Sequence, residues 1–132
     1  MNDDITLFPF TLSMESDREI TIEKGKPIPF NRTEIDRLSD IDYDLETHLF
    51  KVLKPGDYYV SYQMKTNQIY HLTIVGDVDF FEAELFPVEN ISHGSGIITV
   101  SNENVNCYLT CKDHDILLEN GKQATITFFK VR

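Results

Sequence analysis

Hydrophobic and polar residues alternate with a period of two through much of the chain. The range 58–65 shows this clearly, because its even positions are Tyr, Val, Tyr and Met while three of its four odd positions are polar. The same alternation recurs in the ranges 69–75, 80–86, 107–112 and 125–129. Successive side chains of a β-strand point to opposite faces of its sheet, so this pattern predicts half-buried strands.

Residues typical of turns separate these alternating ranges. They stand at 55–57 (Pro-Gly-Asp), 76–77 (Gly-Asp), 93–96 (His-Gly-Ser-Gly) and 120–121 (Asn-Gly). Asn-Gly tolerates the positive φ angles of a tight hairpin, so a hairpin is expected at 119–122. Many short strands joined by turns predict a single all-β domain over residues 1–132, built as a sandwich or a barrel.

The segment Arg32–Thr47 departs from the alternation. Ile35, Leu38 and Leu45 recur near helical spacing there, and Thr33 could cap the start of a helix. This pattern allows two interpretations: a short helical turn, or a solvated loop that joins two strands.

Pairs of adjacent aromatic residues also carry information, because the two members must point to opposite faces of a strand. Such pairs stand at 58–59, 80–81 and 128–129. We expect one set of side chains in the core: Tyr58, Val60, Tyr62, Leu109 and Phe128. We expect another set on the opposite face: Tyr59, Phe81, Phe129 and Val131. A neighbouring subunit would cover this second face, although isolated exposed aromatics are also common and a register error of one residue would exchange the two faces.

Composition narrows the class of protein. The 132 residues are 41% hydrophobic and 26% charged, which is typical of a globular domain. The formal net charge of −10 argues against nucleic acid or an anionic membrane surface as a partner. No apolar run is long enough for a membrane span, and the acidic start Met1–Asp4 is unlike a secretory signal peptide.

Cys107 and Cys111 would lie roughly 13 Å apart on one face of a strand, so both are expected to be free, buried thiols.

No constellation of catalytic residues emerges, and we expect a protein that is not an enzyme. Metal-binding jelly rolls of the cupin type need two histidines at alternate strand positions, whereas all four histidines here are isolated. Cys107, Cys111 and His114 lack the spacing of a zinc knuckle.

One acidic stretch raises the question of calcium. Asp40, Asp42 and Asp44 alternate like the first ligands of a calcium-binding loop, but the central glycine of such a loop is missing. The stretch is either a calcium site or a solvated acidic loop.

Three phrases resemble a known superfamily. The run Phe50–Tyr62, with its Pro-Gly followed by Tyr-Tyr and alternating aromatics, is similar to the globular heads of complement-type proteins in the tumour necrosis factor-like superfamily. Lys26–Asn31 and Gln123–Val131 resemble the C-terminal domain of bacterial collagen-like glycoproteins of the spore surface, the exosporium. The resemblance implies a two-sheet antiparallel jelly roll of about ten strands and a tight homotrimer. It also implies location at a spore surface, although six glycines without a period exclude the collagen stalk of those proteins.

These observations lead to one expectation and two alternatives. We expect a homotrimeric, non-enzymatic domain for structural assembly or recognition at a bacterial surface, with a protein or a carbohydrate as a further ligand. The first alternative is a cupin-like or other jelly roll that binds a small molecule. The second is the receptor-binding head of a phage or an adhesin.

Overall fold

A computed structural model describes residues 8–66, 68, 70–76, 79–84, 86–88 and 91–131, with only the backbone described at 79–84, 86–88, 91 and 92. This described part contains thirteen strands and no helix, and therefore no helix that could span a membrane. The strands are β1 (Phe10–Ser16), β2 (Ile20–Ile22), β3 (Arg32–Asp36), β4 (Ile41–Asp44), β5 (Leu49–Val52), β6 (Gly56–Met64), β7 (His71–Gly76), β8 (Asp79–Glu84), β9 (Phe86–Val88), β10 (Ile91–Val100), β11 (Val105–Thr110), β12 (Ile116–Leu118) and β13 (Gly121–Lys130).

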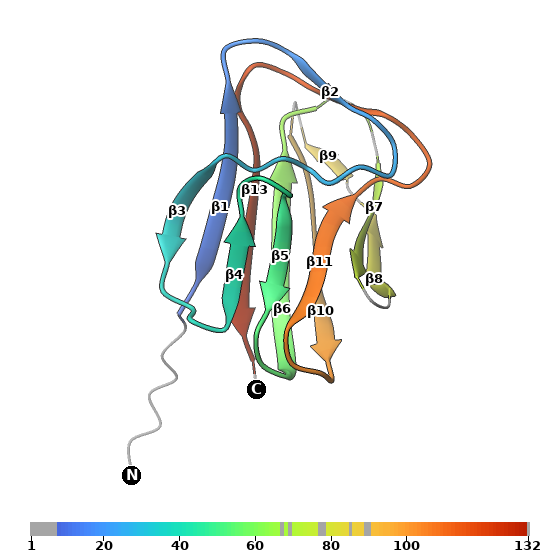
Figure 1. Ribbon diagram of the computed structural model, residues 1–132. Coiled ribbons are helices and arrows are strands. Elements are labelled where there is room, and N and C mark those ends of the chain that lie inside the picture. Colours follow the sequence, from blue (N-terminus) through green and yellow to red (C-terminus); the bar gives the residue numbers. More distant parts are fainter. Residues whose placement is uncertain are drawn as a thin grey trace.

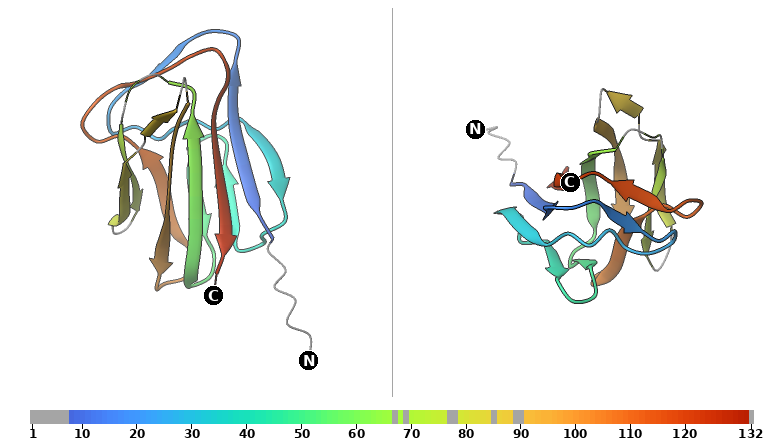
Figure 2. Two further views of the ribbon diagram at one scale, coloured as in Figure 1. Left: turned by 180° about the vertical axis from the view of Figure 1, so that it is seen from behind. Right: turned by 90° about the horizontal axis from the view of Figure 1, so that it is seen from above.

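The strands form two large sheets that pack face to face, as Figures 1 and 2 show. One sheet has six strands in the order β3-β1-β13-β6-β10-β9, and the other has five in the order β4-β5-β11-β7-β8. A short pair, β12 with β2, crosses one end of the sandwich (Figure 1). All these pairings are antiparallel. The expected two-sheet antiparallel jelly roll is confirmed. About ten strands were expected and the described part has thirteen, of which β2, β9 and β12 are only three residues long.

The core lies between the two sheets and contains the predicted inward set. Tyr58, Val60 and Phe128 are fully buried, and Tyr62 and Leu109 are 2% exposed, so this part of the prediction is confirmed. Aromatic rings connect the sheets, because the ring centroid of Phe50 on β5 is 4.9 Å from that of Phe128 on β13. Cys107 and Cys111 are buried and neither forms a disulfide, as expected.

The segment Arg32–Thr47 forms neither a helix nor one continuous loop, so both interpretations of it are wrong. It contains β3 and β4, which lie at the edges of different sheets. All five residues of β3 are exposed, so the strand has no buried face that could produce a recognisable alternation. Pairing with β1 and β5 holds these two strands in place, and local propensity does not predict such pairing.

Two predicted turns are also wrong. Residues 93–96 lie inside β10, where Gly94 and Gly96 pair with Tyr62 and Val60. The Asn-Gly pair does not close a hairpin, because β12 pairs with β2 while β13 pairs with β1 and β6. The chain instead turns a corner at Gly121, where it passes from the β2–β12 pair into the six-stranded sheet. The φ of Gly121 is 103°, a value that glycine adopts without strain.

Candidate functional site

The outer face of the six-stranded sheet carries a row of hydrophobic side chains. In the strand register, Phe129 on β13 pairs with Tyr59 on β6, and Tyr59 pairs with Ile97 on β10. Their chain neighbours Phe128, Tyr58 and Ile98 are fully buried, so these three side chains point away from the core. Tyr59 is 37% exposed and Ile97 is 55% exposed, while Phe129 is half-buried.

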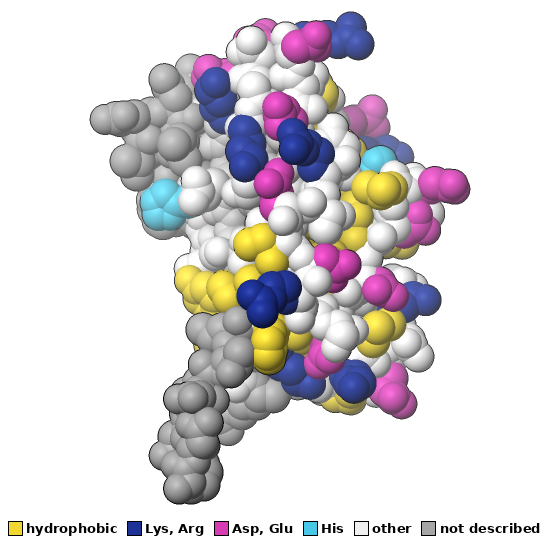
Figure 3. Space-filling view, turned by 90° about the vertical axis from the view of Figure 1, so that its left-hand side faces the viewer, with side chains coloured by type: hydrophobic (Ala, Val, Ile, Leu, Met, Phe, Trp, Pro, Cys, Tyr) yellow, Lys and Arg dark blue, Asp and Glu magenta, His cyan; other side chains and the backbone are white. Residues whose placement is uncertain are grey.

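Val131 extends this row toward the end of the sheet. Its backbone N–H donates to the carbonyl oxygen of Asp57 at 2.7 Å, which continues the β13–β6 ladder by one residue, and its side chain is 51% exposed. We call Tyr59, Ile97, Phe129 and Val131 the apolar patch. Figure 3 shows the side of the molecule that carries β3, where charged side chains gather in the upper half and the lower half mixes hydrophobic side chains with further charged ones.

A row of small hydroxyl side chains borders the apolar patch. Thr11, Thr127, Ser61 and Ser95 occupy consecutive positions across β1, β13, β6 and β10. The hydroxyl oxygens of Thr11 and Thr127 lie 2.9 Å apart and share a hydrogen bond. Small side chains keep this part of the face flat, so that another surface could approach it closely.

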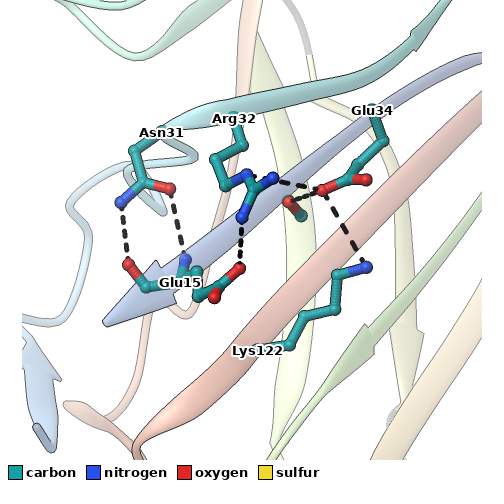
Figure 4. A network of polar contacts seen from close by, with 6 residues as sticks. Glu15, Asn31, Arg32, Glu34 and Lys122 are labelled. Carbon is teal, nitrogen blue, oxygen red and sulfur yellow. Dashed lines mark hydrogen bonds and ion pairs between the residues drawn. The ribbon is translucent and has the colours of Figure 1, made fainter. Parts of the chain in front are cut away.

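A charged network lies beyond the hydroxyl row, and Figure 4 shows it from close by. It consists of Ser13, Glu15, Asn31, Arg32, Glu34 and Lys122. The Arg32 guanidinium lies 2.6 Å from the Glu15 carboxylate and 3.8 Å from that of Glu34, and Lys122 Nζ lies 3.9 Å from Glu34. The Ser13 hydroxyl donates to Glu34 at 2.6 Å, and this bond, followed by the charges of Lys122 and Arg32, lowers the pKa of Glu34 against the opposing effect of desolvation. The charged side chains of this network therefore form their ion pairs with one another, within a single chain.

At the opposite end of this face lies a pocket of about 350 Å³ that contains a partly buried ion pair. Its lining residues are Phe8, Arg37, Leu38, Ser39, Asp40, Lys130 and Val131. Asp40 is 7% exposed, and its carboxylate oxygen is 2.7 Å from Lys130 Nζ. The Tyr58 hydroxyl donates to the Lys54 carbonyl at 2.6 Å and lies 3.4 Å from the same Asp40 oxygen. Burial, and then the negative charge of Asp40, raise the pKa of Tyr58.

The three candidate calcium ligands are not brought together. Asp40 pairs with Lys130, and Asp42 is exposed on β4. One oxygen of Asp44 accepts hydrogen bonds from the backbone N–H groups of Glu46 and Thr47, and these bonds lower the pKa of Asp44. In the part of the chain that the structure describes, no three His, Cys, Asp or Glu side chains are arranged to hold a metal ion. The contacts of Asp40 and Asp44 favour a structural role for these two carboxylates.

Three of the four predicted outward residues, Tyr59, Phe129 and Val131, are on the outer face of the six-stranded sheet. Phe81 lies on β8 of the five-stranded sheet, so it does not share this face, and its side chain lies outside the described residues. Sequence reasoning missed Ile97. The pair Ile97-Ile98 could have indicated it, because two adjacent hydrophobic residues on a strand point to opposite faces, as in the aromatic pairs. The turn wrongly predicted at 93–96 kept this segment from being recognised as a strand.

Comparisons with known proteins identify the fold. No protein-family model and no curated protein sequence matches the chain. Among solved structures, the globular domain of zebrafish complement 1qA protein superposes with a TM-score of 0.66 at 14% identity, covering 96% of this chain and 98% of that one. The Eiger TNF of S. frugiperda gives a TM-score of 0.66 at 10% identity, covering 96% of this chain and 93% of that one.

A third solved structure widens the range of proteins with this fold. The PRD1 vertex protein P5 superposes with a TM-score of 0.64 at 14% identity, covering 98% of this chain and 99% of that one. Likenesses at such low identity establish architecture and leave the task of the protein to be argued from its own surface. The chain therefore has the jelly-roll fold that complement globular heads share with proteins of the tumour necrosis factor type.

Proposed function

We propose that this chain is a non-enzymatic domain that assembles into a homotrimer through the outer face of its six-stranded sheet. The observation that carries the proposal is the apolar row, in which Phe129, Tyr59 and Ile97 follow one another across three paired strands. Single exposed hydrophobic residues are ordinary, but a contiguous row on a flat sheet is typical of a contact surface. A second copy of the chain is the occupant that the complement-type resemblance implies.

The arrangement of the face also supports assembly. The apolar patch adjoins small hydroxyl side chains that allow close approach, and the charged network beyond them is paired within the chain. An apolar centre with a polar border is the usual composition of a protein interface. The predicted interface residues Tyr59, Phe129 and Val131 remain part of the proposal, and Ile97 joins them. Phe81 is not part of this interface, because β8 belongs to the five-stranded sheet.

Within this proposal, the biological role is structural assembly or recognition at a bacterial spore surface. Its support is the resemblance of Lys26–Asn31 and Gln123–Val131 to the spore-surface glycoproteins. A second candidate, the head of a phage or an adhesin, is favoured by the likeness to PRD1 vertex protein P5. Both roles use the same trimer. A binding assay on isolated spores, compared with intact vegetative cells, would separate them.

The first test measures the mass of the protein in solution. Light scattering coupled to gel filtration should give three times the 15.3 kDa of the chain at micromolar concentration. Phe129→Glu should dissociate this species, because burying an unpaired carboxylate costs about 2 kcal/mol or more at each interface. Circular dichroism should still show a folded β-protein, since Phe129 points away from the core.

Leu45→Glu provides the matched control. Leu45 is 59% exposed but lies in the turn between β4 and β5, away from the six-stranded sheet, so this variant should remain trimeric. A wild-type protein that stays at 15.3 kDa would refute the proposed function. A trimeric Phe129→Glu variant would show that assembly uses another surface.

A further inference from the structure

Arg37 follows β3 at the end of the sheet where the apolar patch ends. Its backbone N–H donates to the Pro9 carbonyl at 3.0 Å, which fixes the chain there. Its guanidinium carbon lies 5.7 Å from the centre of the Phe8 ring. This cation–π contact holds the side chain over an aromatic face while leaving its five N–H donors available. Within the described residues, the Arg37 side chain has no carboxylate partner.

The three cations on the described strands of this sheet all have carboxylate partners within the chain. Arg32 contacts Glu15 and Glu34, and Lys122 contacts Glu34. Lys130 contacts Asp40. Arg37 therefore differs from them, although it lines the same pocket as the Asp40–Lys130 pair.

The pocket beside Arg37 combines apolar walls with a local excess of positive charge. Phe8, Leu38 and Val131 provide the apolar walls, and the charges of Asp40 and Lys130 cancel. The remaining charge is that of Arg37, in a chain whose formal net charge is −10. An anionic group next to an apolar contact would fit this end of the face.

We propose that Arg37 binds a carboxylate of the neighbouring copy, so that each interface of the trimer is closed by an ion pair at this end. The inference rests on the proposed homotrimer. A second copy is the occupant for two reasons: Val131 makes the pocket continuous with the apolar patch, and each copy has 22 acidic residues against 12 basic ones. In a three-fold ring the two sides of an interface are different surfaces, so Arg37 meets a region of the neighbour other than its own pocket.

The ion pair also has a role that hydrophobic contacts cannot fill. Each copy has a net charge of −10, so three copies repel one another as they assemble. A positive group placed at the contact offsets this repulsion locally. It also makes the orientation of the neighbour specific, because only a surface with a carboxylate at the matching position fits.

The experiment compares three proteins by sedimentation equilibrium: the wild type, Arg37→Gln and Arg18→Gln. Arg18 is exposed in the loop between β1 and β2, and its replacement changes the net charge by the same amount. Arg37→Gln should raise the concentration at which the trimer dissociates by about tenfold, while Arg18→Gln should not raise it. Arg37→Lys, which keeps the charge but loses the planar fork, should fall in between.

Sodium chloride provides a second readout. Salt weakens the Arg37 ion pair but also screens the repulsion between copies, so the informative quantity is the difference between the two glutamine variants. That difference should shrink as sodium chloride rises from about 0.05 M to about 0.5 M. A trimeric wild type in which Arg37→Gln and Arg18→Gln dissociate at the same concentration would overturn this inference alone. A monomeric wild type would overturn both it and the proposed function.

Discussion

An ion pair connects the two large sheets near the apolar patch. Asp40 precedes β4 of one sheet, and Lys130 ends β13 of the other, with 2.7 Å between their charged atoms. The Asp40 side chain is 10% exposed and that of Lys130 is 29% exposed, so water compensates little for the carboxylate if its partner is removed. Removing one member of such a pair costs more than the pair itself contributes, because the remaining charge stays buried.

Lys130→Met should therefore lower the free energy of unfolding by about 2 kcal/mol, a figure reduced for the partial exposure of the lysine. Urea denaturation at neutral pH would measure the loss. The double variant Asp40→Asn with Lys130→Met should lose less than Lys130→Met alone, because no charge is left unpaired. Equal losses in the two variants would show that the lysine contributes through packing of its aliphatic chain.

At the scale of elements, β12 and β13 show how a strong local signal can be misleading. Asn120-Gly121 matches a tight hairpin, yet the two flanking strands belong to different sheets. Gly121 adopts a φ of 103°, which suits glycine equally well in a hairpin and in a corner. Local chemistry therefore predicted the unusual backbone angle correctly, while long-range pairing with β1 and β6 determined where the chain goes.

Gly121→Ala should destabilise the fold by about 1 to 2 kcal/mol, because a positive φ strains any residue with a Cβ atom. A Cβ atom at this position would also lie 3.3 Å from Lys65 Nζ, a contact that a flexible lysine can relieve. Thermal unfolding would detect the change. Gly25→Ala is the control for strain alone, since its φ is 80° and nothing lies within 4 Å of the added atom. A larger loss at Gly121 than at Gly25 would assign the difference to the lysine contact.

Alternation predicted the strands that have one buried face, such as β6, whose residues at even positions from Tyr58 to Met64 are all buried. It failed at β3, where every side chain is exposed, and at residues 93–96 of β10, where two glycines hide the pattern. Whether an edge strand or a glycine-rich strand forms depends on its pairing with neighbouring strands, and the residues of the strand alone do not predict that pairing.

At the scale of the whole molecule, the candidate site depends on strand order. Phe129, Tyr59 and Ile97 are far apart in the chain and become neighbours because β13, β6 and β10 are adjacent. Sequence could predict that Tyr59 and Phe129 face outward together, but the pairing that brings in Ile97 is a product of the complete sheet. The jelly-roll arrangement itself was available only through resemblance.

Buried tyrosines give the molecule a defined response to alkali. Burial raises the pKa of Tyr43, Tyr58 and Tyr62, and the buried Tyr62 hydroxyl has no hydrogen-bond partner among the described residues. Above the ordinary tyrosine pKa of 10.0, the unfolded chain releases these protons while the folded chain retains them. The unfolded state then binds fewer protons, so the free energy of unfolding is maintained below pH 10.0 and falls as the pH rises further.

Urea midpoints measured at about pH 8 and about pH 11 should show this fall. Tyr62→Phe should reduce it, because one of the three ionisable groups is gone. It should also raise stability at pH 8 by about 1 kcal/mol, since a buried hydroxyl without a partner is removed. Lysines also titrate in this range, and the difference between the variant and the wild type separates their contribution. An identical fall in both proteins would exclude Tyr62 as a contributor.

Phe8 and Val131, close to the two ends of the chain, line the same small pocket. The described part of the chain therefore begins and ends at this pole of the sandwich, opposite the β2–β12 pair (Figure 1). In a three-fold assembly with its axis along the sandwich, Phe8 and Val131 of all three copies would lie on one side. Immobilising the protein on the side of this pole would leave the three β2–β12 poles accessible together. A multivalent ligand could then bind all three copies at once and gain avidity.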